Sequence, residues 1–310
     1  MKFAFVFPGQ GSQSVGMLDI FRDHPAVKAT LEEASDALQQ DIGRLIERGP
    51  IDQLNLTTHT QPVMLTAAYA IYRVWQQSGG AVPDIVAGHS LGEYTALVAS
   101  NAITFRDAVL LVRFRAQAMQ QAVQTQVGGM AAILGLDDDA VLDACFEAGS
   151  AGVVEAVNFN TPAQVVIAGY MTAVEKACEI AKAKGAKHTV LLPVSAPFHS
   201  SLLKPASERL REYLADVSMC VPQIPVINNV DVAIVSNPES IKDALVRQAA
   251  SPVRWVECVR AIAAQNITHM IECGPGRILT RMTRCIDTSL VAGSIADLAL
   301  LNNMLKLLQS

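Results

Sequence analysis

Short apolar runs alternate with longer amphipathic segments along most of this chain, and that alternation constrains its fold more than any other feature. Residues 3–7 and 85–87 are short hydrophobic runs, whereas residues 60–77 and 107–123 repeat their hydrophobic positions with the period of an α-helix. Strands that alternate with helices of this length favour a largely parallel sheet covered by helices. The predicted fold class is therefore α/β.

The middle of the chain shows a different order of elements. Its hydrophobic patterns predict the order β-α-β-β-α-β, which is the ferredoxin-like pattern. These elements cover residues 130–134, 137–146, 153–159, 164–168, 172–184 and 187–194, with a turn at 160–163. Further strands are expected at 226–227, 270–272 and 289–292. We therefore predict an inserted ferredoxin-like α+β subdomain at residues 124–196 and a large α/β domain formed by residues 1–123 and 197–310.

Composition restricts the classes of function. The net charge of −5 is unsuited to general binding of nucleic acid, which needs a basic face. No apolar run approaches the roughly 20 residues that a membrane span needs, and the first residues do not resemble a signal peptide, so a cytoplasmic protein is expected. The six cysteines lie far apart without a C-x-x-C pair, which argues against a metal site or a disulfide framework.

A G-x-S-x-G motif places Ser90 between Gly88 and Gly92, after a predicted strand and before a predicted helix. This is the context of a nucleophile elbow, in which a sharp turn presents the serine hydroxyl above the sheet. Ser90 is thus a candidate nucleophile. The alternative is an ordinary strand-to-helix loop in which Ser90 caps the helix.

A serine nucleophile needs a base, and His199 is the candidate because it follows a strand and a turn where the chain returns from the subdomain. A structural, hydrogen-bonded histidine is the alternative. His89 adjoins Ser90 and cannot easily bend back to the hydroxyl of its neighbour. The imidazole of His199 would be oriented either by Asp231 or by a backbone carbonyl. The remaining histidines are expected on the surface or in packing roles: His24, His59, His188 and His269.

Glycines after the first strand resemble a dinucleotide fingerprint, but Ser14 occupies the position of its third glycine and no acidic residue follows at the required distance. No cofactor is therefore expected. Backbone N–H groups of this loop are instead expected to complete an oxyanion hole with the N–H of Leu91.

Arg113 and Arg115 stand two positions apart on one predicted helix and point to nearly opposite faces. An inward arginine would bind a substrate carboxylate through paired hydrogen bonds. The default expectation is that both arginines are solvated.

Several separated motifs, taken together, closely resemble the malonyl-CoA:acyl carrier protein transacylase family over essentially the whole chain. They lie at residues 7–13, 60–62, 88–94, 158–169, 193–200 and 274–276. The resemblance implies a hydrolase-like α/β domain with a ferredoxin-like insertion. It also implies a ping-pong transfer of malonyl from coenzyme A to the phosphopantetheine thiol of an acyl carrier protein, in support of fatty acid synthesis.

The resemblance also implies the roles of individual residues. Ser90 would be the nucleophile and His199 the base, oriented by the main-chain carbonyl of Gln248. The N–H groups of Gln10 and Leu91 would form the oxyanion hole.

For the acyl group, the resemblance implies that Arg115 binds the malonyl carboxylate and that Gln61 lines the pocket beside it. The bulk of Phe198 would disfavour an α-methyl branch. Ala116 departs from the glycine that is frequent after the arginine in this family.

A carrier protein is acidic, so basic side chains near the mouth of the site are candidates for docking it. The alternative is a solvated surface. The two basic clusters are Lys182, Lys184 and Lys187, and Arg277, Arg281 and Arg284. A monomer without a metal is expected. Rival functions are a hydrolase that uses the same serine, a non-catalytic acyl-binding subunit, and the related transferase of malonate decarboxylase or of a polyketide pathway.

Overall fold

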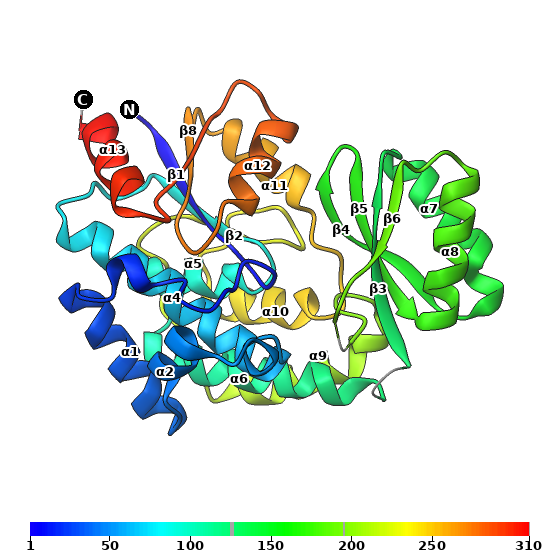
Figure 1. Cartoon of the computed structure of the whole chain (residues 1–310), viewed down its shortest axis with the longest axis horizontal. Coiled ribbons are helices and arrows are strands. Elements are labelled where there is room, and N and C mark those ends of the chain that lie inside the picture. The colour runs from blue at the N-terminus through cyan, green and yellow to red at the C-terminus, as the bar shows by residue number, and fades with distance from the viewer. Residues whose placement is uncertain (125–126, 195, 310) are drawn as a thin grey trace.

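Strand β1 (Phe3–Phe7) lies at the centre of a five-stranded parallel sheet in the larger of two lobes (Figure 1). The computed structural model describes residues 1–124, 127–194 and 196–309. In spatial order the strands of this sheet are β7 (Val226–Ile227), β2 (Ile85–Gly88), β1, β8 (His269–Glu272) and β9 (Val291–Ser294). Every neighbouring pair is parallel.

Both faces of this sheet are buried, which explains why β1 is a continuous hydrophobic run. Phe5 and Phe7 pack on one face against Tyr72 of α4 (Thr57–Gln77). Ala4 and Val6 belong to a separate core on the other face, with Trp255 of α11 (Trp255–Ala263). Side chains alternate across a strand, so β1 supplies both cores at once.

The remaining helices of this lobe surround the sheet. They are α1 (Pro25–Leu38), α2 (Ile42–Arg48), α3 (Ile51–Leu54), α5 (Gly92–Ala99), α6 (Phe105–Ala122), α9 (Lys204–Ala215), α10 (Pro238–Gln248), α12 (Ile278–Ile286) and α13 (Leu298–Gln309). None of the helices in the described part of the chain combines the length and hydrophobicity that a membrane crossing requires.

The smaller lobe contains a four-stranded antiparallel sheet in the order β4-β5-β3-β6. Its elements are β3 (Gly128–Leu134), α7 (Asp138–Ala148), β4 (Val154–Thr161), β5 (Gln164–Tyr170), α8 (Met171–Ala183) and β6 (His188–Leu191). The order β-α-β-β-α-β confirms the predicted ferredoxin-like α+β arrangement, and the parallel sheet of the larger lobe confirms the predicted α/β class. Helices α7 and α8 share a core with this sheet. The domain boundaries at 124 and 196 stay a prediction, and residues 125–126 and 195 lie outside the described residues.

Some predicted element ends are wrong. Strand β6 ends at Leu191 and not at residue 194, because Pro193 has no N–H for the ladder. Asn160 and Thr161 belong to strand β4, so the turn consists of residues 162–163. Helix α4 begins at Thr57, three residues before the predicted start, and contains Pro62 in its second turn.

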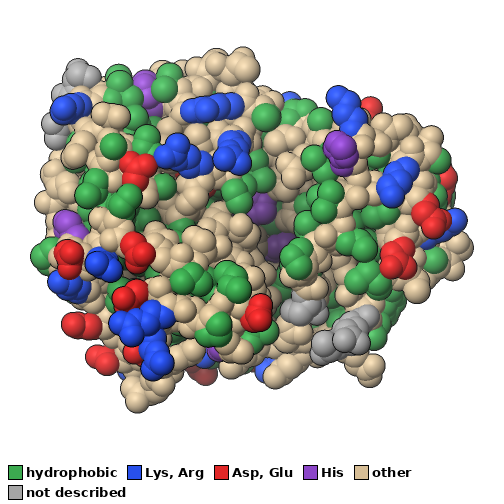
Figure 2. All heavy atoms as spheres, viewed as in Figure 1, with side chains coloured by type: hydrophobic (Ala, Val, Ile, Leu, Met, Phe, Trp, Pro, Cys, Tyr) green, Lys and Arg blue, Asp and Glu red, His purple; other side chains and the backbone are tan. Residues whose placement is uncertain are grey.

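Backbone hydrogen bonds join the two lobes at the edge of the small sheet. The N–H of Phe159 in β4 donates to the carbonyl of Val253 at 3.0 Å, and the N–H of Val253 donates to Val157 at 2.9 Å. The segment around Val253 in the larger lobe therefore pairs with β4 through a single parallel β-bridge to Asn158. Figure 2 shows a hollow between the lobes, with histidine side chains visible inside it.

Candidate active site

Ser90 lies in the sharp turn between β2 and α5, at the carboxyl end of the parallel sheet. Its φ of 52° is in the left-handed region, which is strained for a residue with a side chain. Gly88 and Gly92 are needed around it. A Cβ on Gly88 would lie 1.9 Å from the carbonyl carbon of Gly92, and one on Gly92 would lie 2.0 Å from the carbonyl oxygen of Phe7. The motif is therefore explained by close backbone approach.

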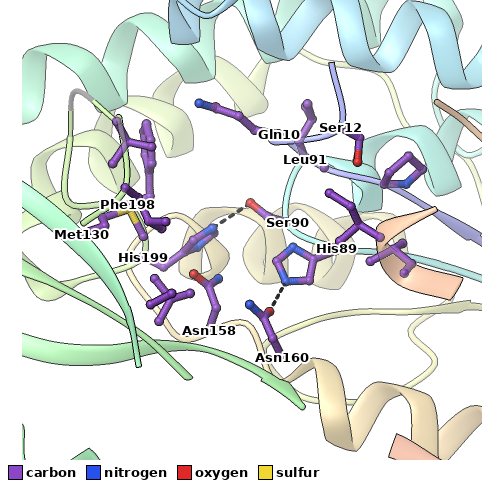
Figure 3. A pocket seen from close by; sticks show the side chains of 18 of the residues that line it. Gln10, Ser12, His89, Ser90, Leu91, Met130, Asn158, Asn160, Phe198 and His199 are labelled. Atoms are coloured by element: carbon purple, nitrogen blue, oxygen red, sulfur yellow. Dashed lines mark hydrogen bonds between the residues drawn. The ribbon is translucent and has the colours of Figure 1, made fainter. Parts of the chain in front are cut away.

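His199 reaches the hydroxyl of Ser90, from which it is separated by 109 positions in the sequence. Its Nε2 lies 2.7 Å from Ser90 Oγ (Figure 3). Its Nδ1 lies 2.8 Å from the main-chain carbonyl oxygen of Gln248, at the end of α10. A carbonyl only accepts, so Nδ1 carries the proton and Nε2 is free to accept the proton of Ser90.

Asp231 does not orient His199. Both of its carboxylate oxygens accept hydrogen bonds from the guanidinium of Arg247, each at 2.7 Å. Of the two groups considered for orienting His199, the structure therefore shows a main-chain carbonyl, that of Gln248, in hydrogen-bond contact with the ring.

Burial sets the protonation state of this histidine. The pKa of His199 is lowered to about 3 by burial first and by the charge of Arg115 second. The imidazole is therefore neutral near neutral pH, which is the form that a general base needs.

Arg115 is buried on α6 and points into the site. Its Nη1 donates to Oε1 of Gln61 at 2.8 Å. Its Nη2 donates to Ser90 Oγ at 3.2 Å and to Oε1 of Gln248 at 3.0 Å. The default expectation of a solvated side chain is therefore wrong for Arg115, although Arg113 does turn away and donates to Gln40. Burial lowers the pKa of Arg115, but a guanidinium is not deprotonated in proteins, so the side chain stays cationic.

A buried polar network beneath the elbow was missed from sequence. Asn229 accepts from the N–H of Ser90 at 2.7 Å and donates to the carbonyl of Gly88 at 2.9 Å. Glu93 accepts from the N–H of Asn229 and from Nε2 of Gln248, both at 2.9 Å. Burial raises the pKa of Glu93 to about 7. The signal available in the sequence was Glu93 itself, an acidic residue among apolar ones in a helix that packs on the sheet.

A cavity of about 300 Å³ opens above Ser90. The larger lobe lines it with residues of the first loop, the elbow, the turn at 198–199 and three helices: Pro8, Gly9, Gln10, Ser12, Gln61, His89, Ser90, Leu91, Arg115, Phe198, His199, Ile278, Leu279 and Met282. The smaller lobe adds Met130, Ala132, Asn158, Asn160, Gln164, Val166, Leu192 and Val194. Seven of the eight predicted site residues lie here, and Gln248 reaches the site through His199 and Arg115.

The two predicted donors of an oxyanion hole flank the cavity. Leu91 is the N-cap of α5, so its N–H lies at a helix N-terminus, where negative charge is favoured. Gln10 lies on the loop after β1, and its side chain points away from Ser90 in Figure 3. Its Nε2 donates to Oγ1 of Thr57 at 3.5 Å.

His89 lies on the other side of Ser90 and bridges the lobes. Its Nε2 donates to Oδ1 of Asn160 in β4 at 2.8 Å (Figure 3). Its ring also packs edge-on against Trp255, with the centroids 5.5 Å apart. The bond to Asn160 directs His89 away from the hydroxyl of Ser90.

Comparison with known proteins identifies the family. The model of the acyl transferase domain matches residues 4–304. The malonyl CoA-acyl carrier protein transacylase of Escherichia coli K12 is 51% identical over 297 residues, which are 96% of each chain. The crystal structure of an acyl-carrier-protein S-malonyltransferase from Burkholderia pseudomallei 1710b is 70% identical, covers 99% of this chain and 100% of that one, and superposes with a TM-score of 0.98.

A third similar structure is a type II PKS acyl-carrier protein in complex with its malonyl-transacylase. The matched chain is 47% identical with a TM-score of 0.97, and the match covers 99% of both chains. The resemblance inferred from the sequence motifs is thus confirmed: the chain belongs to the malonyl CoA-acyl carrier protein transacylase family of enzymes.

Proposed function

We propose that this enzyme transfers malonyl groups from malonyl-CoA to the phosphopantetheine thiol of an acyl carrier protein through a Ser90 acyl-enzyme, and that it supplies fatty acid synthesis. One observation carries the proposal: a serine hydroxyl within 2.7 Å of a neutral imidazole lies beside a buried arginine. The first pair suits acyl transfer, and the arginine suits an acyl group that ends in a carboxylate.

In the first half-reaction, Ser90 Oγ attacks the thioester carbonyl while His199 Nε2 takes the hydroxyl proton. The N–H groups of Gln10 and Leu91 hold the oxyanion. Collapse of the intermediate breaks the carbon–sulfur bond, and His199 returns the proton to the leaving thiolate of coenzyme A. The thiol of the carrier then attacks the Ser90 ester and repeats these steps in reverse.

Selection of the acyl group follows from the residues around Ser90. Arg115 holds the malonyl carboxylate, and Gln61 fixes the guanidinium from its other side at 2.8 Å. Phe198 packs in a buried cluster with Met119 and Met130. This packing leaves Phe198 little freedom to move aside for an α-methyl branch.

The carrier docks beside α12 in this proposal. Three residues of that helix line the cavity, and three exposed arginines lie on or next to the same helix: Arg277, Arg281 and Arg284. Figure 2 shows Lys and Arg side chains gathered at this rim of the hollow. Lys182, Lys184 and Lys187 lie instead at the connection from α8 to β6, which contributes no lining residue among those described. Lys184 also forms an ion pair with Glu147 at 2.8 Å.

The decisive experiment is mass spectrometry of the protein after brief incubation with malonyl-CoA alone. A malonyl adduct is expected on the peptide that contains Ser90, and added holo carrier protein should discharge it to malonyl carrier. Ser12 also lines the cavity, so Ser12→Ala is a matched control that should still be labelled, whereas Ser90→Ala should not.

Two results would contradict the proposal. Release of free malonate without transfer to the carrier would indicate a hydrolase. Absence of any turnover would indicate a binding subunit.

A further inference from the structure

The side chain of Gln248 forms hydrogen bonds with Arg115 and with the main chain of Ser90, which the main chain of Gln248 does not contact. Its main-chain carbonyl accepts from His199, as described above. Its side-chain Oε1 accepts from Nη2 of Arg115 at 3.0 Å, and its Nε2 donates to the main-chain carbonyl of Ser90 at 3.0 Å. The side chain is fully buried, so each of these bonds is formed away from water.

Glu93 determines which way this amide points. The Nε2 of Gln248 donates to Oε2 of Glu93 at 2.9 Å as well as to the carbonyl of Ser90. A flipped amide would place its oxygen against these two acceptors and its NH₂ group against the donor of Arg115. Leaving buried polar groups unpaired in this way is costly, so the amide is held in one orientation.

The amide also separates the guanidinium of Arg115 from the carboxyl group of Glu93. The guanidinium donates to uncharged groups of Gln61, Ser90 and Gln248. The carboxyl group of Glu93 accepts from the amide of Gln248, and this amide in turn accepts from Arg115. A direct ion pair would occupy the fork of Arg115 and compete with an incoming carboxylate. An intervening neutral amide aims the guanidinium and leaves it able to bind that carboxylate.

We propose that the side chain of Gln248, oriented by Glu93, is a positioning residue that aims Arg115 at the acyl pocket and thereby sets the preference for a carboxylate-bearing acyl group. We call the three side chains the Arg115–Gln248–Glu93 relay. This inference rests on the proposed function, because it assigns the carboxylate to Arg115. It is distinct from the orientation of His199, which uses the main chain of Gln248.

The test compares acylation of Ser90 by malonyl-CoA and by acetyl-CoA in variants of the full chain. Gln248→Met keeps the length of the side chain and the carbonyl that holds His199, but it removes both amide contacts. Loss of a hydrogen bond to a charged group predicts a fall of roughly 10- to 100-fold in kcat/KM for malonyl-CoA, mainly through KM. For acetyl-CoA, whose acyl group has no carboxylate, we expect a smaller fall, so the malonyl-to-acetyl ratio of kcat/KM should decrease.

Variants of Glu93 test the orientation step. Glu93→Gln keeps an oxygen that can accept from Gln248 and Asn229, so the malonyl-to-acetyl ratio of kcat/KM should stay near that of the wild type. Glu93→Met removes the acceptor and should lower the ratio as Gln248→Met does. If Gln248→Met does not fold, Gln248→Asn replaces it, since this change keeps the amide but withdraws it from Arg115 by one methylene group.

The outcomes separate this inference from the proposed function. An unchanged malonyl-to-acetyl ratio in Arg115→Ala would overturn the carboxylate clamp itself. A lowered ratio in Arg115→Ala with an unchanged ratio in folded Gln248→Met or Gln248→Asn would overturn the relay alone. Equal losses with both substrates would show that Gln248 serves only the structure of the elbow. Equal damage from Glu93→Gln and Glu93→Met would overturn the orienting role of Glu93.

Discussion

The two sheets of this protein meet the same cavity in different ways. The parallel sheet directs the carboxyl ends of its strands toward it, and the loops after β1 and β2 bring polar backbone groups and Ser90 to one edge. The antiparallel sheet presents a face. Met130 and Ala132 of β3 line the cavity, while Ala131 and Ile133 between them pack against α7 and α8. The ends of parallel strands thus supply the proposed chemistry, and the open face of the antiparallel sheet supplies shape.

The polar side chains of the site are likewise distributed unequally between the two lobes. The proposed nucleophile Ser90 and its proposed base His199 belong to the larger lobe, as do Arg115, Gln248 and Glu93. The smaller lobe adds Asn158 and Asn160 at alternate positions of β4, together with a mostly apolar lining. Changes in the larger lobe should therefore have greater effects than matched changes in the smaller one.

The largest difference is expected for a glycine-to-alanine change in each lobe. In Gly92→Ala the new Cβ would lie 2.0 Å from the carbonyl oxygen of Phe7. This overlap should cost about 3 kcal/mol or more in the free energy of unfolding. Gly149→Ala is the control, because nothing lies within 4 Å of its Cβ and its φ is −58°. It should be neutral or stabilise by about 0.4–1 kcal/mol. Urea unfolding measures both, and equal effects would show that the close approach of Gly92 to Phe7 does not constrain the elbow.

A smaller effect is expected where the smaller lobe supports the elbow. Asn160→Ala removes the acceptor for Nε2 of buried His89 and should lower the free energy of unfolding by about 1–3 kcal/mol. Asn158→Ala, which changes a side chain lining the same cavity, is the control and should cost less. Denaturant titration of both variants tests this, and a fully stable Asn160→Ala protein would show that the bond is dispensable.

Charge reversal should separate the two basic clusters by their effect on the carrier. Arg281→Glu with Arg284→Glu should raise KM for the carrier roughly tenfold and leave KM for malonyl-CoA unchanged, because these exposed side chains lie on the helix where we propose that the carrier docks. Lys182→Glu with Lys187→Glu should change KM for the carrier less. Steady-state kinetics at low and high salt measure both pairs. Equal effects on carrier and malonyl-CoA would refute docking at α12.

The smallest effect is expected when the pH is varied, because the imidazole of His199 should not change its charge near neutral pH. With its pKa lowered to about 3, the ring should stay neutral in an NMR titration from pH 8 to about 5. The unfolded chain takes up this proton first, near pH 6.5, so the contribution of His199 to stability is present above that pH and is lost as the pH falls toward 3. A midpoint near 6.5 in the folded protein would show that the ring is not desolvated.

Much of the fold was predictable because its signals are local. The hydrophobic run at residues 3–7 coincides with β1, and the order of elements in the smaller lobe agrees with the prediction. Strand ends were less predictable. Strand β9 covers Val291–Ser294 and not residues 289–292, since pairing with β8 sets its bounds and no local pattern records that partner.

The site divides in the same way. Ser90 was identifiable because its two glycines stand between a strand and a helix in a short local motif. Gly88 is required within the turn itself, whereas Gly92 is required by the carbonyl oxygen of Phe7 on β1. Helical spacing predicts that Arg113 and Arg115 point to opposite faces, but it does not say which of them points inward. The family resemblance indicated Arg115. Burial depends on which face of α6 meets the elbow, so the structure shows the difference in environment directly.

The sequence by itself determined the strand, the tight turn and the helix that present Ser90, because backbone sterics act between neighbouring residues. Only the tertiary structure decided what surrounds that hydroxyl. The bond from His199 spans 109 positions, and the bond from the side chain of Gln248 to the carbonyl of Ser90 spans 158. Such pairs are formed by the packing of elements from distant segments, and no local pattern in either segment specifies its partner.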